Sequence, residues 1–274
     1  MTPKMFVFDL DGTLLNCRKE ISPPTIRALR EMADYGALIV LASGRISNSI
    51  KQYLPVLDID AAVLSLNGAV VCMNKAHNER CVHRSILGQI YSDYLIQFAS
   101  NKPFATNIYV DDTLYTFDTK LARYWTDLYS LQTKTQYIFL TSYDKFQNIA
   151  PSKISFIGEI NELDRLEMDF RAKWDHRQVY ICRTWEHYLE FLNPDANKGD
   201  ALCKLAQAYG IGMSDVVAFG DGENDLPMLQ RAGTSIAMLN GRENVKMSSK
   251  RVTQYTNDED GIAHEWERIK QELL

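Results

Sequence analysis

Strand and helix patterns alternate at both ends of this 274-residue chain, and this alternation constrains its fold more than any other feature. Residues 4–10 and 37–42 are short apolar runs typical of buried strands, with an amphipathic helical pattern between them. The alternation returns between residues 199 and 238. Strands that alternate with helices predict a parallel sheet covered by helices. We therefore expect an α/β fold with a doubly wound parallel sheet.

The segment between these two halves has a different character. It is rich in aromatic residues and shows mixed strand and helix patterns. We interpret it as an inserted α/β domain at residues 82–188, which leaves a discontinuous core domain at residues 1–81 and 189–274. A chain of this length has room for two such domains.

The composition argues against several kinds of partner. A formal net charge of −5 gives no support to a surface for nucleic acid or for anionic membranes. No apolar run reaches the roughly 18 residues that a membrane span needs. The five cysteines are odd in number and form no CxxC pair, so we expect free thiols in a cytoplasmic protein. We expect a monomer or a small homo-oligomer.

Two carboxylates stand where the first predicted strand ends. Asp9 and Asp11 are separated by one residue, and Gly12 after them lets the backbone turn close to a ligand. In an open parallel sheet, ligands bind outside the carboxyl ends of the strands. One carboxylate of such a pair can attack as a nucleophile while the other transfers a proton. An ordinary acidic turn is the alternative, and the pair alone does not decide between them.

The sequence Asp-Leu-Asp-Gly-Thr at residues 9–13 resembles the first motif of the phosphatases in the haloacid dehalogenase superfamily. Residues 42–45, 198–199 and 220–225 resemble the second, third and fourth motifs, in the right order. The nearest group is the Cof-like hydrolases, which carry a large α/β cap between the second and third motifs. The inserted segment falls in that interval, and the resemblance covers both halves of the core.

The resemblance implies a role for each motif residue. Asp9 is expected to attack phosphorus and carry an aspartyl-phosphate, with Asp11 as general acid and base. The residues implied in binding phosphate are Ser43, Gly44, Lys198 and Asn224. Those implied in holding Mg²⁺ are Asp9, Asp11 through its backbone carbonyl, and Asp221, with Asp225 as a neighbour of the metal or of Lys198.

Physical chemistry favours magnesium at such a site. A phosphomonoester is dianionic near neutral pH, so a cation is needed to bring it to a carboxylate. Mg²⁺ requires few carboxylates and keeps several waters, whereas the set of Cys and His ligands that zinc prefers does not occur here. Taken singly, some motif residues have ordinary alternatives: Ser43 as a helix N-cap and Lys198 as a surface lysine.

The resemblance also implies that the cap closes over the site and contacts the leaving group. The alternative is that Trp185 packs inside the cap and that the charged residues around it form a solvent-exposed face. The candidate substrate contacts are Arg45 and Asn67 in the core and Arg183, Trp185, His187 and Glu190 in or near the end of the insert.

The expected activity is hydrolysis of a small phosphomonoester, with sugar phosphates first and cofactor or nucleotide phosphates next. Two alternatives stay open at this point. One is phosphotransfer to another hydroxyl, as in the related phosphomannomutases. The other is metabolite binding without catalysis, which loss of Asp9 or Asp11 would have indicated; both are present.

Overall fold

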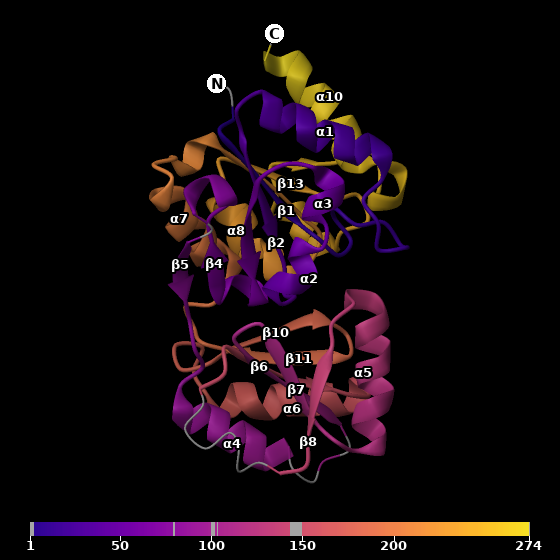
Figure 1. Ribbon diagram of the computed structural model, residues 1–274, viewed down its shortest axis with the longest axis vertical. Helices are drawn as coiled ribbons and strands as arrows, with labels where there is room; N and C mark the ends of the chain where they lie inside the picture. Colours follow the sequence, from indigo (N-terminus) through magenta and orange to yellow (C-terminus); the bar gives the residue numbers. More distant parts are fainter. Residues whose placement is uncertain (1–2, 79, 100–101, 103, 143–149, 274) are drawn as a thin grey trace.

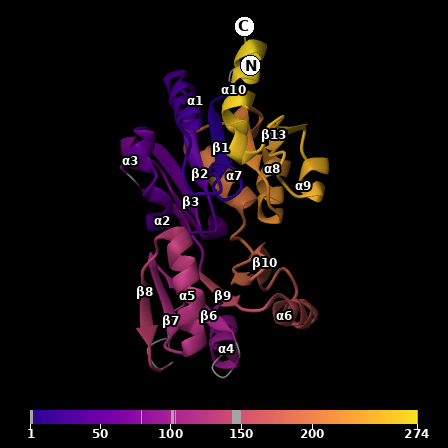
Figure 2. The same ribbon diagram turned by 90° about the vertical axis from the view of Figure 1, so that its right-hand side faces the viewer.

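Over residues 3–78, 80–99, 102, 104–142 and 150–273, which the computed structural model describes, the chain forms two layered bodies stacked end to end (Figure 1). We call the body with the eight-stranded sheet the core and the body with the six-stranded sheet the cap. Both chain termini lie at the end of the core that is remote from the cap, and a view from the side shows the same stacking (Figure 2).

The core sheet confirms the predicted doubly wound α/β fold. It is parallel from β14 to β3 and antiparallel at β4 and β5. In sheet order its strands are β14 (Arg251–Val252), β13 (Thr234–Ala237), β12 (Val216–Gly220), β1 (Met5–Asp9), β2 (Leu38–Ala42), β3 (Ala61–Ser65), β4 (Val70–Cys72) and β5 (Cys81–Arg84).

Helices cover both faces of this sheet because its strands are apolar on both sides. Phe8 packs in the cluster with α1 and α10, whereas Val7 packs on the opposite face with α7 and α8. Ser22 caps the start of α1, where its Oγ accepts a bond from the Thr25 amide. The core helices are α1 (Pro23–Asp34), α2 (Ser47–Lys51), α3 (Leu54–Leu57), α7 (Lys198–Ala208), α8 (Leu226–Arg231), α9 (Glu243–Met247) and α10 (Gly261–Leu273).

The cap sheet has one face toward α4 and α6 and the other toward α5 and the core. Phe156 and Phe191 lie in the cluster with α4 and α6, whereas Tyr188 packs with α5 and with core residue Leu66. In order, the strands are β10 (Tyr180–Trp185), β11 (Tyr188–Leu192), β9 (Lys153–Ile157), β6 (Ala105–Val110), β7 (Thr113–Phe117) and β8 (Tyr137–Leu140). The helices are α4 (Gln89–Ala99), α5 (Lys120–Thr133) and α6 (Ile160–Lys173).

Sheet membership changes slightly later than the predicted borders of 82–188. Strand β5 extends to Arg84 and still pairs with β4 of the core sheet. Strand β11, which begins at Tyr188, pairs with β9 and β10 of the cap sheet. The chain therefore crosses between the sheets after Arg84 and after Leu192, while the extent of each folding unit stays a prediction.

The prediction that all cysteines are free thiols is wrong. Cys72 and Cys81 form a disulfide, while Cys17, Cys182 and Cys203 are free. The reason is strand register: the two residues face each other across β4 and β5, with Cα atoms 4.1 Å apart. Their separation of nine residues in the sequence carries no CxxC signal.

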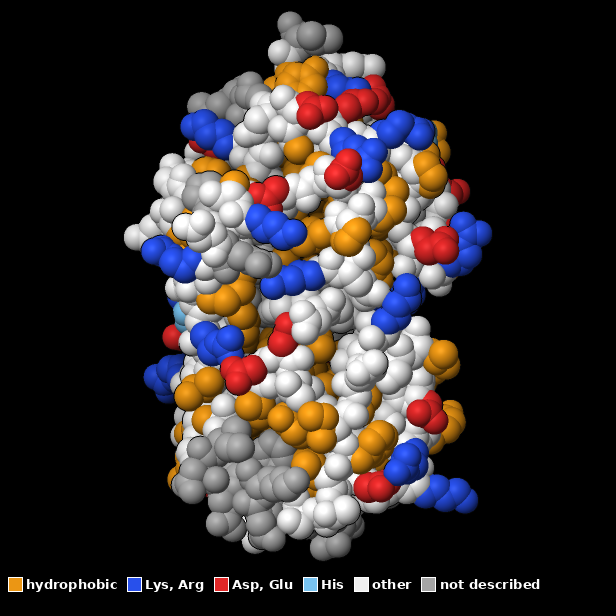
Figure 3. Space-filling view, in the orientation of Figure 1, with side chains coloured by type: hydrophobic (Ala, Val, Ile, Leu, Met, Phe, Trp, Pro, Cys, Tyr) orange, Lys and Arg blue, Asp and Glu red, His pale blue; other side chains and the backbone are white. Residues whose placement is uncertain are grey.

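The described helices include none that is both long enough and apolar enough to cross a lipid bilayer. The outer face of α5 exposes an apolar stripe, and hydrophobic side chains are visible at this edge of the cap (Figure 3). Its members are Leu121, Tyr124, Leu128 and Leu131.

Candidate active site

A cavity of about 330 Å³ lies between the core and the cap, at the carboxyl ends of the core strands. The core part of its lining includes the predicted residues Asp9, Asp11, Ser43, Gly44, Arg45, Asn224, Asp221 and Asp225. The cap contributes Tyr129, Thr133, Thr184, Trp185, Tyr188 and Glu190. The structure thus brings the first, second and fourth motifs together around one space.

The turn after β1 is packed directly against the turn after β12. Gly12 has a φ of +86°, and a Cβ at this position would lie 2.5 Å from Asp221 Oδ2. The adjacent Thr13 Oγ1 donates a 2.6 Å hydrogen bond to Asp221 Oδ1. Only glycine allows both this backbone conformation and this close approach, so Gly12 and Thr13 together fix the position of the Asp221 carboxylate.

Lys198 lies fully buried beneath Asp9. It starts helix α7, which Asn197 caps by accepting a 2.9 Å bond from the Asp200 amide. Its Nζ donates to Asp9 Oδ1 and, at 2.5 Å, to Asp225 Oδ1. Burial disfavours the charged amine, but Asp225 and Asp9 outweigh that effect and hold the pKa of Lys198 above its usual value. Lys198 is therefore an internal counter-ion, and the alternative of a surface lysine is wrong.

Three carboxylates converge beside Lys198. One oxygen from each of Asp9, Asp221 and Asp225 lies within 4.8 Å of the others. Burial, followed by the charge of Asp225, raises the pKa of Asp9 well above its usual value and that of Asp221 to about 7. Asp225 also accepts bonds from the backbone amides of Asp221 and Gly222, which holds the turn in place.

This cluster fits a divalent cation. Carboxylate oxygens are the ligands that Mg²⁺ prefers, and a single lysine leaves the two buried acids and the half-buried Asp221 with an excess of negative charge. Asp225, expected beside the metal or Lys198, stands within the cluster itself. The carboxylate of Asp11 does not, because it turns toward Arg45.

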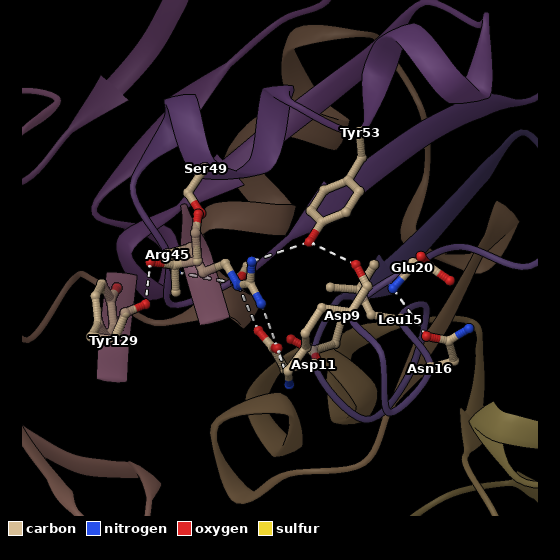
Figure 4. Close-up of polar contacts among 12 residues, drawn as sticks. Asp9, Asp11, Leu15, Asn16, Glu20, Arg45, Ser49, Tyr53 and Tyr129 are labelled. Carbon is tan, nitrogen blue, oxygen red and sulfur yellow. Dashed lines mark hydrogen bonds and ion pairs between the residues drawn. The ribbon is translucent and has the colours of Figure 1, made fainter. Parts of the chain in front are cut away.

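Asp11 is held by two cations, Arg45 and Lys19, and Figure 4 shows Arg45 at its carboxylate. Arg45 Nε lies 2.7 Å from Oδ2 and Nη2 lies 2.6 Å from Oδ1, while Lys19 Nζ lies 2.7 Å from Oδ1. Burial opposes ionisation of Asp11, but Arg45 and then Lys19 outweigh it and lower the pKa of the carboxyl. Sequence reasoning missed Lys19, because this residue lies outside every motif.

The loops after β2 and β3 are joined to each other. The backbone amide of Arg45 donates to Ser43 Oγ at 3.2 Å, and the backbone amide of Asn67 donates to the Ser43 carbonyl at 3.0 Å. Asn224 Nδ2 in turn donates to Asn67 Oδ1 at 3.0 Å. Ser43 does not cap α2, whose N-cap is Ile46. The helix-cap alternative for Ser43 is therefore wrong, and its buried hydroxyl faces the cavity region instead.

Arg183 and His187 do not line the cavity. Side chains alternate along a strand, so Arg183 points to the face that carries α6, where its Nη2 lies 2.8 Å from Asp164 Oδ1. His187 lies in the turn between β10 and β11, with Nδ1 2.8 Å from the Gly158 carbonyl oxygen. Their expected role as substrate contacts lacks support, because both side chains are engaged within the cap.

Other residues of the cavity lining were missed by sequence reasoning. Tyr129 and Thr133 come from α5, whereas the contacts expected from the insert all lie near its end. Asn240 and Arg242 follow β13, and Asn240 Nδ2 donates to the Gly12 carbonyl at 2.7 Å. The strand-end position of Asn240 and Arg242 is a signal that could have found them.

Comparison with known proteins identifies the family of this chain. The family model for haloacid dehalogenase-like hydrolases matches residues 6–265. The chain is 28% identical to the 5-amino-6-(5-phospho-D-ribitylamino)uracil phosphatase YwtE of Bacillus subtilis, over 95% of this chain and 96% of that protein. It is 29% identical to the HMP-PP phosphatase of Yersinia enterocolitica, over 95% and 93% of the respective chains.

Solved structures show the same arrangement over nearly the whole chain. A haloacid dehalogenase-like hydrolase from Bacteroides thetaiotaomicron superposes with a TM-score of 0.86 at 27% identity, covering 98% of this chain and all of that one. The matched family model, these relatives and the strand-end site lead to one conclusion: this chain belongs to the haloacid dehalogenase-like hydrolases and is a phosphoric monoester hydrolase of their Cof-like group.

Proposed function

We propose that this phosphatase hydrolyses a small phosphomonoester with Mg²⁺, through an aspartyl-phosphate on Asp9. The observation that carries the proposal is the position of Asp9, which ends the central strand β1 at the cavity with Lys198 below it. Lys198 occupies Oδ1, so Oδ2 is the oxygen left to attack phosphorus. Bound Mg²⁺ would neutralise the Asp9, Asp221 and Asp225 cluster and polarise the phosphoryl oxygens.

In the first half-reaction, the Asp9 carboxylate forms a bond to phosphorus as the bond from phosphorus to the ester oxygen breaks. Asp11 gives its proton to the leaving oxygen, which departs as an alcohol. Ser43, the loop amides and Asn224 hold the transferring oxygens, and Lys198 balances the charge of Asp9 from below, because phosphoryl transfer depends mainly on positioning and electrostatic stabilisation.

In the second half-reaction, Asp11 takes a proton from a water molecule. That water attacks phosphorus, the bond to Asp9 breaks, and the products are inorganic phosphate and a free Asp9 carboxylate. Asp11 ends the cycle protonated, ready to act again as the acid. General acid–base help of this kind contributes on the order of 10²–10⁴-fold to the rate.

The cavity supports a small, polar leaving group. Its volume of about 330 Å³ is at the low end for ligand pockets. Polar side chains from both bodies line the cavity, among them Asn240 and Arg242 of the core and Thr133 of the cap, which favours a sugar or polyol phosphate. YwtE is named for a substrate with a phosphorylated ribityl chain, which is a polyol phosphate, and cofactor or nucleotide phosphates are the next class.

The test is phosphate release from a panel of sugar, cofactor and nucleotide phosphates, with Mg²⁺ and with a chelator. We expect release from one or a few members, and loss of release when the metal is removed. Asp9→Asn should lower turnover by at least about 10⁴-fold while substrate still binds. Asp58→Asn is the matched control, because Asp58 is exposed at the end of α3 in a left-handed conformation that Asn tolerates. Turnover in Asp9→Asn would exclude Asp9 as the nucleophile.

We propose the cytoplasm as the compartment, as the sequence suggested. The Cys72–Cys81 disulfide makes this proposal testable, because cytosolic thiols are kept reduced. The protein would then work mainly in the dithiol form.

A further inference from the structure

A buried ion pair in the cap stands beside the cavity. Lys153 on β9 is 1% exposed and Glu190 on β11 is 3% exposed, with Nζ 2.7 Å from Oε1. Burial disfavours the charged amine, but Glu190 outweighs it and holds the pKa of Lys153 above its usual value. Burying two charges is unfavourable unless their other hydrogen-bonding positions are also satisfied. The other hydrogen-bond partners of Lys153 and Glu190 therefore indicate which groups the pair stabilises.

Among the described residues of the cap, the Tyr109 ring lies 4.3 Å from Lys153 Nζ, and the further hydrogen-bond partners of the pair are weak. Ser155 Oγ lies 3.5 Å from Glu190 Oε1, at the limit of a hydrogen bond, and the Cys182 sulfur lies 3.9 Å from Oε2. The short contacts come from the core. Lys153 Nζ donates to the Gly44 carbonyl at 2.7 Å, and Asn67 Nδ2 donates to Glu190 Oε2 at 2.7 Å.

These two core groups belong to the loops that the proposed function assigns to phosphate. Gly44 directly follows Ser43, and the Asn67 amide and side chain contact the Ser43 carbonyl and Asn224. The loop is also closely packed: a Cβ at Gly44 would lie 3.2 Å from Asn67 Oδ1 and 3.4 Å from Thr184 Cγ2 of the cap. One network thus joins the cap pair to three loops of the core.

We propose that Lys153 and Glu190 are positioning residues that hold the loops at Gly44 and Asn67 in the arrangement that binds phosphate, and only while the cap lies on the core. The inference rests on the proposed function of those loops. Glu190 lines the cavity, but Lys153 engages one of its oxygens and Asn67 the other, so we assign it to positioning Asn67. When the cap moves away, Gly44 and Asn67 lose their charged partners, which couples cap closure to the order of the phosphate-binding loops.

The main test is the double variant Lys153→Met/Glu190→Gln. Removing one partner alone would leave a buried unpaired charge, whereas this pair is neutral and similar in size. The new side-chain amide at position 190 keeps an acceptor for Asn67, but Gly44 loses its donor. We expect kcat/KM to fall by about 10- to 100-fold and the inhibition constant of inorganic phosphate to rise similarly. Mg²⁺ affinity should change by less than about twofold, because the carboxylate cluster lies wholly in the core.

Ser155→Ala is the matched control. It changes the same buried face of β9 but removes no contact to the core, so its kinetic constants should stay near wild type. Lys153→Arg, which keeps a charged donor, should recover part of the phosphate affinity. A double variant with wild-type phosphate affinity, or one that loses Mg²⁺ affinity to the same extent, would overturn the positioning role.

Hydrogen exchange separates this inference from the proposed function. In the protein without substrate, the amides of Arg45 and Asn67 should exchange faster in the double variant than in wild type or Ser155→Ala. Faster exchange in a chain that hydrolyses no ester would support the coupling and refute the proposed function. If exchange at these two amides is unchanged in the double variant while wild-type protein hydrolyses the ester, the coupling is refuted and the proposed function is supported.

A variant on the core side covers the case in which the double variant does not fold. Asn67→Gly removes the side-chain amide that donates to Glu190, and glycine tolerates the φ of +55° at position 67. It should show the same loss of phosphate affinity with Mg²⁺ affinity retained. Wild-type phosphate affinity in Asn67→Gly would overturn the inference.

Discussion

Arg45 binds the carboxylate of Asp11 at both oxygens, with Nε 2.7 Å from Oδ2 and Nη2 2.6 Å from Oδ1. This two-point ion pair keeps Asp11 ionised, whereas the proposed reaction needs it protonated when the leaving oxygen departs. A phosphate dianion in the cavity competes for the same guanidinium. Substrate binding should therefore loosen the pair and raise the pKa of Asp11 at the moment when an acid is required.

Arg45→Gln should raise the pKa of Asp11 in the metal-free protein, because burial is then opposed by Lys19 alone. The direction of the Asp11 pKa shift in the wild-type protein also affects its stability. A lowered pKa stabilises the fold above the unfolded pKa of 3.8, and this contribution is lost as pH falls through the folded pKa. Carbon-13 titration of the Asp11 carboxyl measures the shift. Tyr53→Phe, which keeps the ion pair, is the control, and equal titration of Asp11 in all three proteins would contradict the prediction.

Gly12→Ala should abolish tight Mg²⁺ binding, because the new Cβ would displace the Asp221 carboxylate. Gly36→Ala is the matched control: its φ of +84° imposes similar backbone strain, but nothing lies within 4 Å of the added carbon. Backbone strain should cost both variants about 1 kcal/mol of stability, and the clash with Asp221 should cost Gly12→Ala more. Calorimetric titration with Mg²⁺ should show weakened binding in Gly12→Ala alone. Equal affinities in the two variants would show that Gly12 does not position the metal site.

Mg²⁺ binding should strengthen as pH rises through about 7, because burial and Asp225 raise the pKa of Asp221 to that value. Below it, Asp221 carries a proton that the metal must displace, so binding releases protons. Calorimetry in buffers of different ionisation enthalpy counts them. Thr13→Val removes a bond that favours the charged carboxylate, and should weaken binding more below pH 7 than above it. An Mg²⁺ affinity that does not change with pH around 7 would refute the assignment of Asp221 as the group that titrates there.

The Cys72–Cys81 disulfide predicts three titratable thiols in the unfolded, unreduced protein and five after reduction. Because the bond closes a short loop, reduction should lower the free energy of unfolding by about 2–3 kcal/mol. Cys72→Ser/Cys81→Ser should match the reduced wild type and respond to no reductant. Five thiols before reduction would show that the pair does not form in solution.

The motif residues were predictable because each stands at a strand end or helix start. Asp9 ends one strand of the parallel sheet, Ser43 and Asp221 follow two others, and the carboxyl ends of parallel strands lie at the same edge. The family resemblance then assigned chemistry to these positions. No contact within the site had to be known for this part of the prediction.

The cap contacts depended on side-chain direction, which sequence spacing alone did not provide. Arg183 and Thr184 are neighbours on β10, yet only Thr184 faces the cavity. Lys153 stands in a buried strand, where a charge is compatible with folding only if a partner meets it. That partner, Glu190, is 37 residues away and comes close through the register of β9 and β11.

The two crossings between the sheets, after Arg84 and after Leu192, also define an engineering boundary. A chimaera that replaces residues 85–192 with the cap of a relative would inherit the metal cluster and Lys198 intact. It would also leave the Gly44 carbonyl and the Asn67 side-chain amide opposite the side chains of another protein's cap. Transplanting substrate preference between such enzymes therefore requires matching donor and acceptor side chains on the incoming cap, in addition to a suitable pocket.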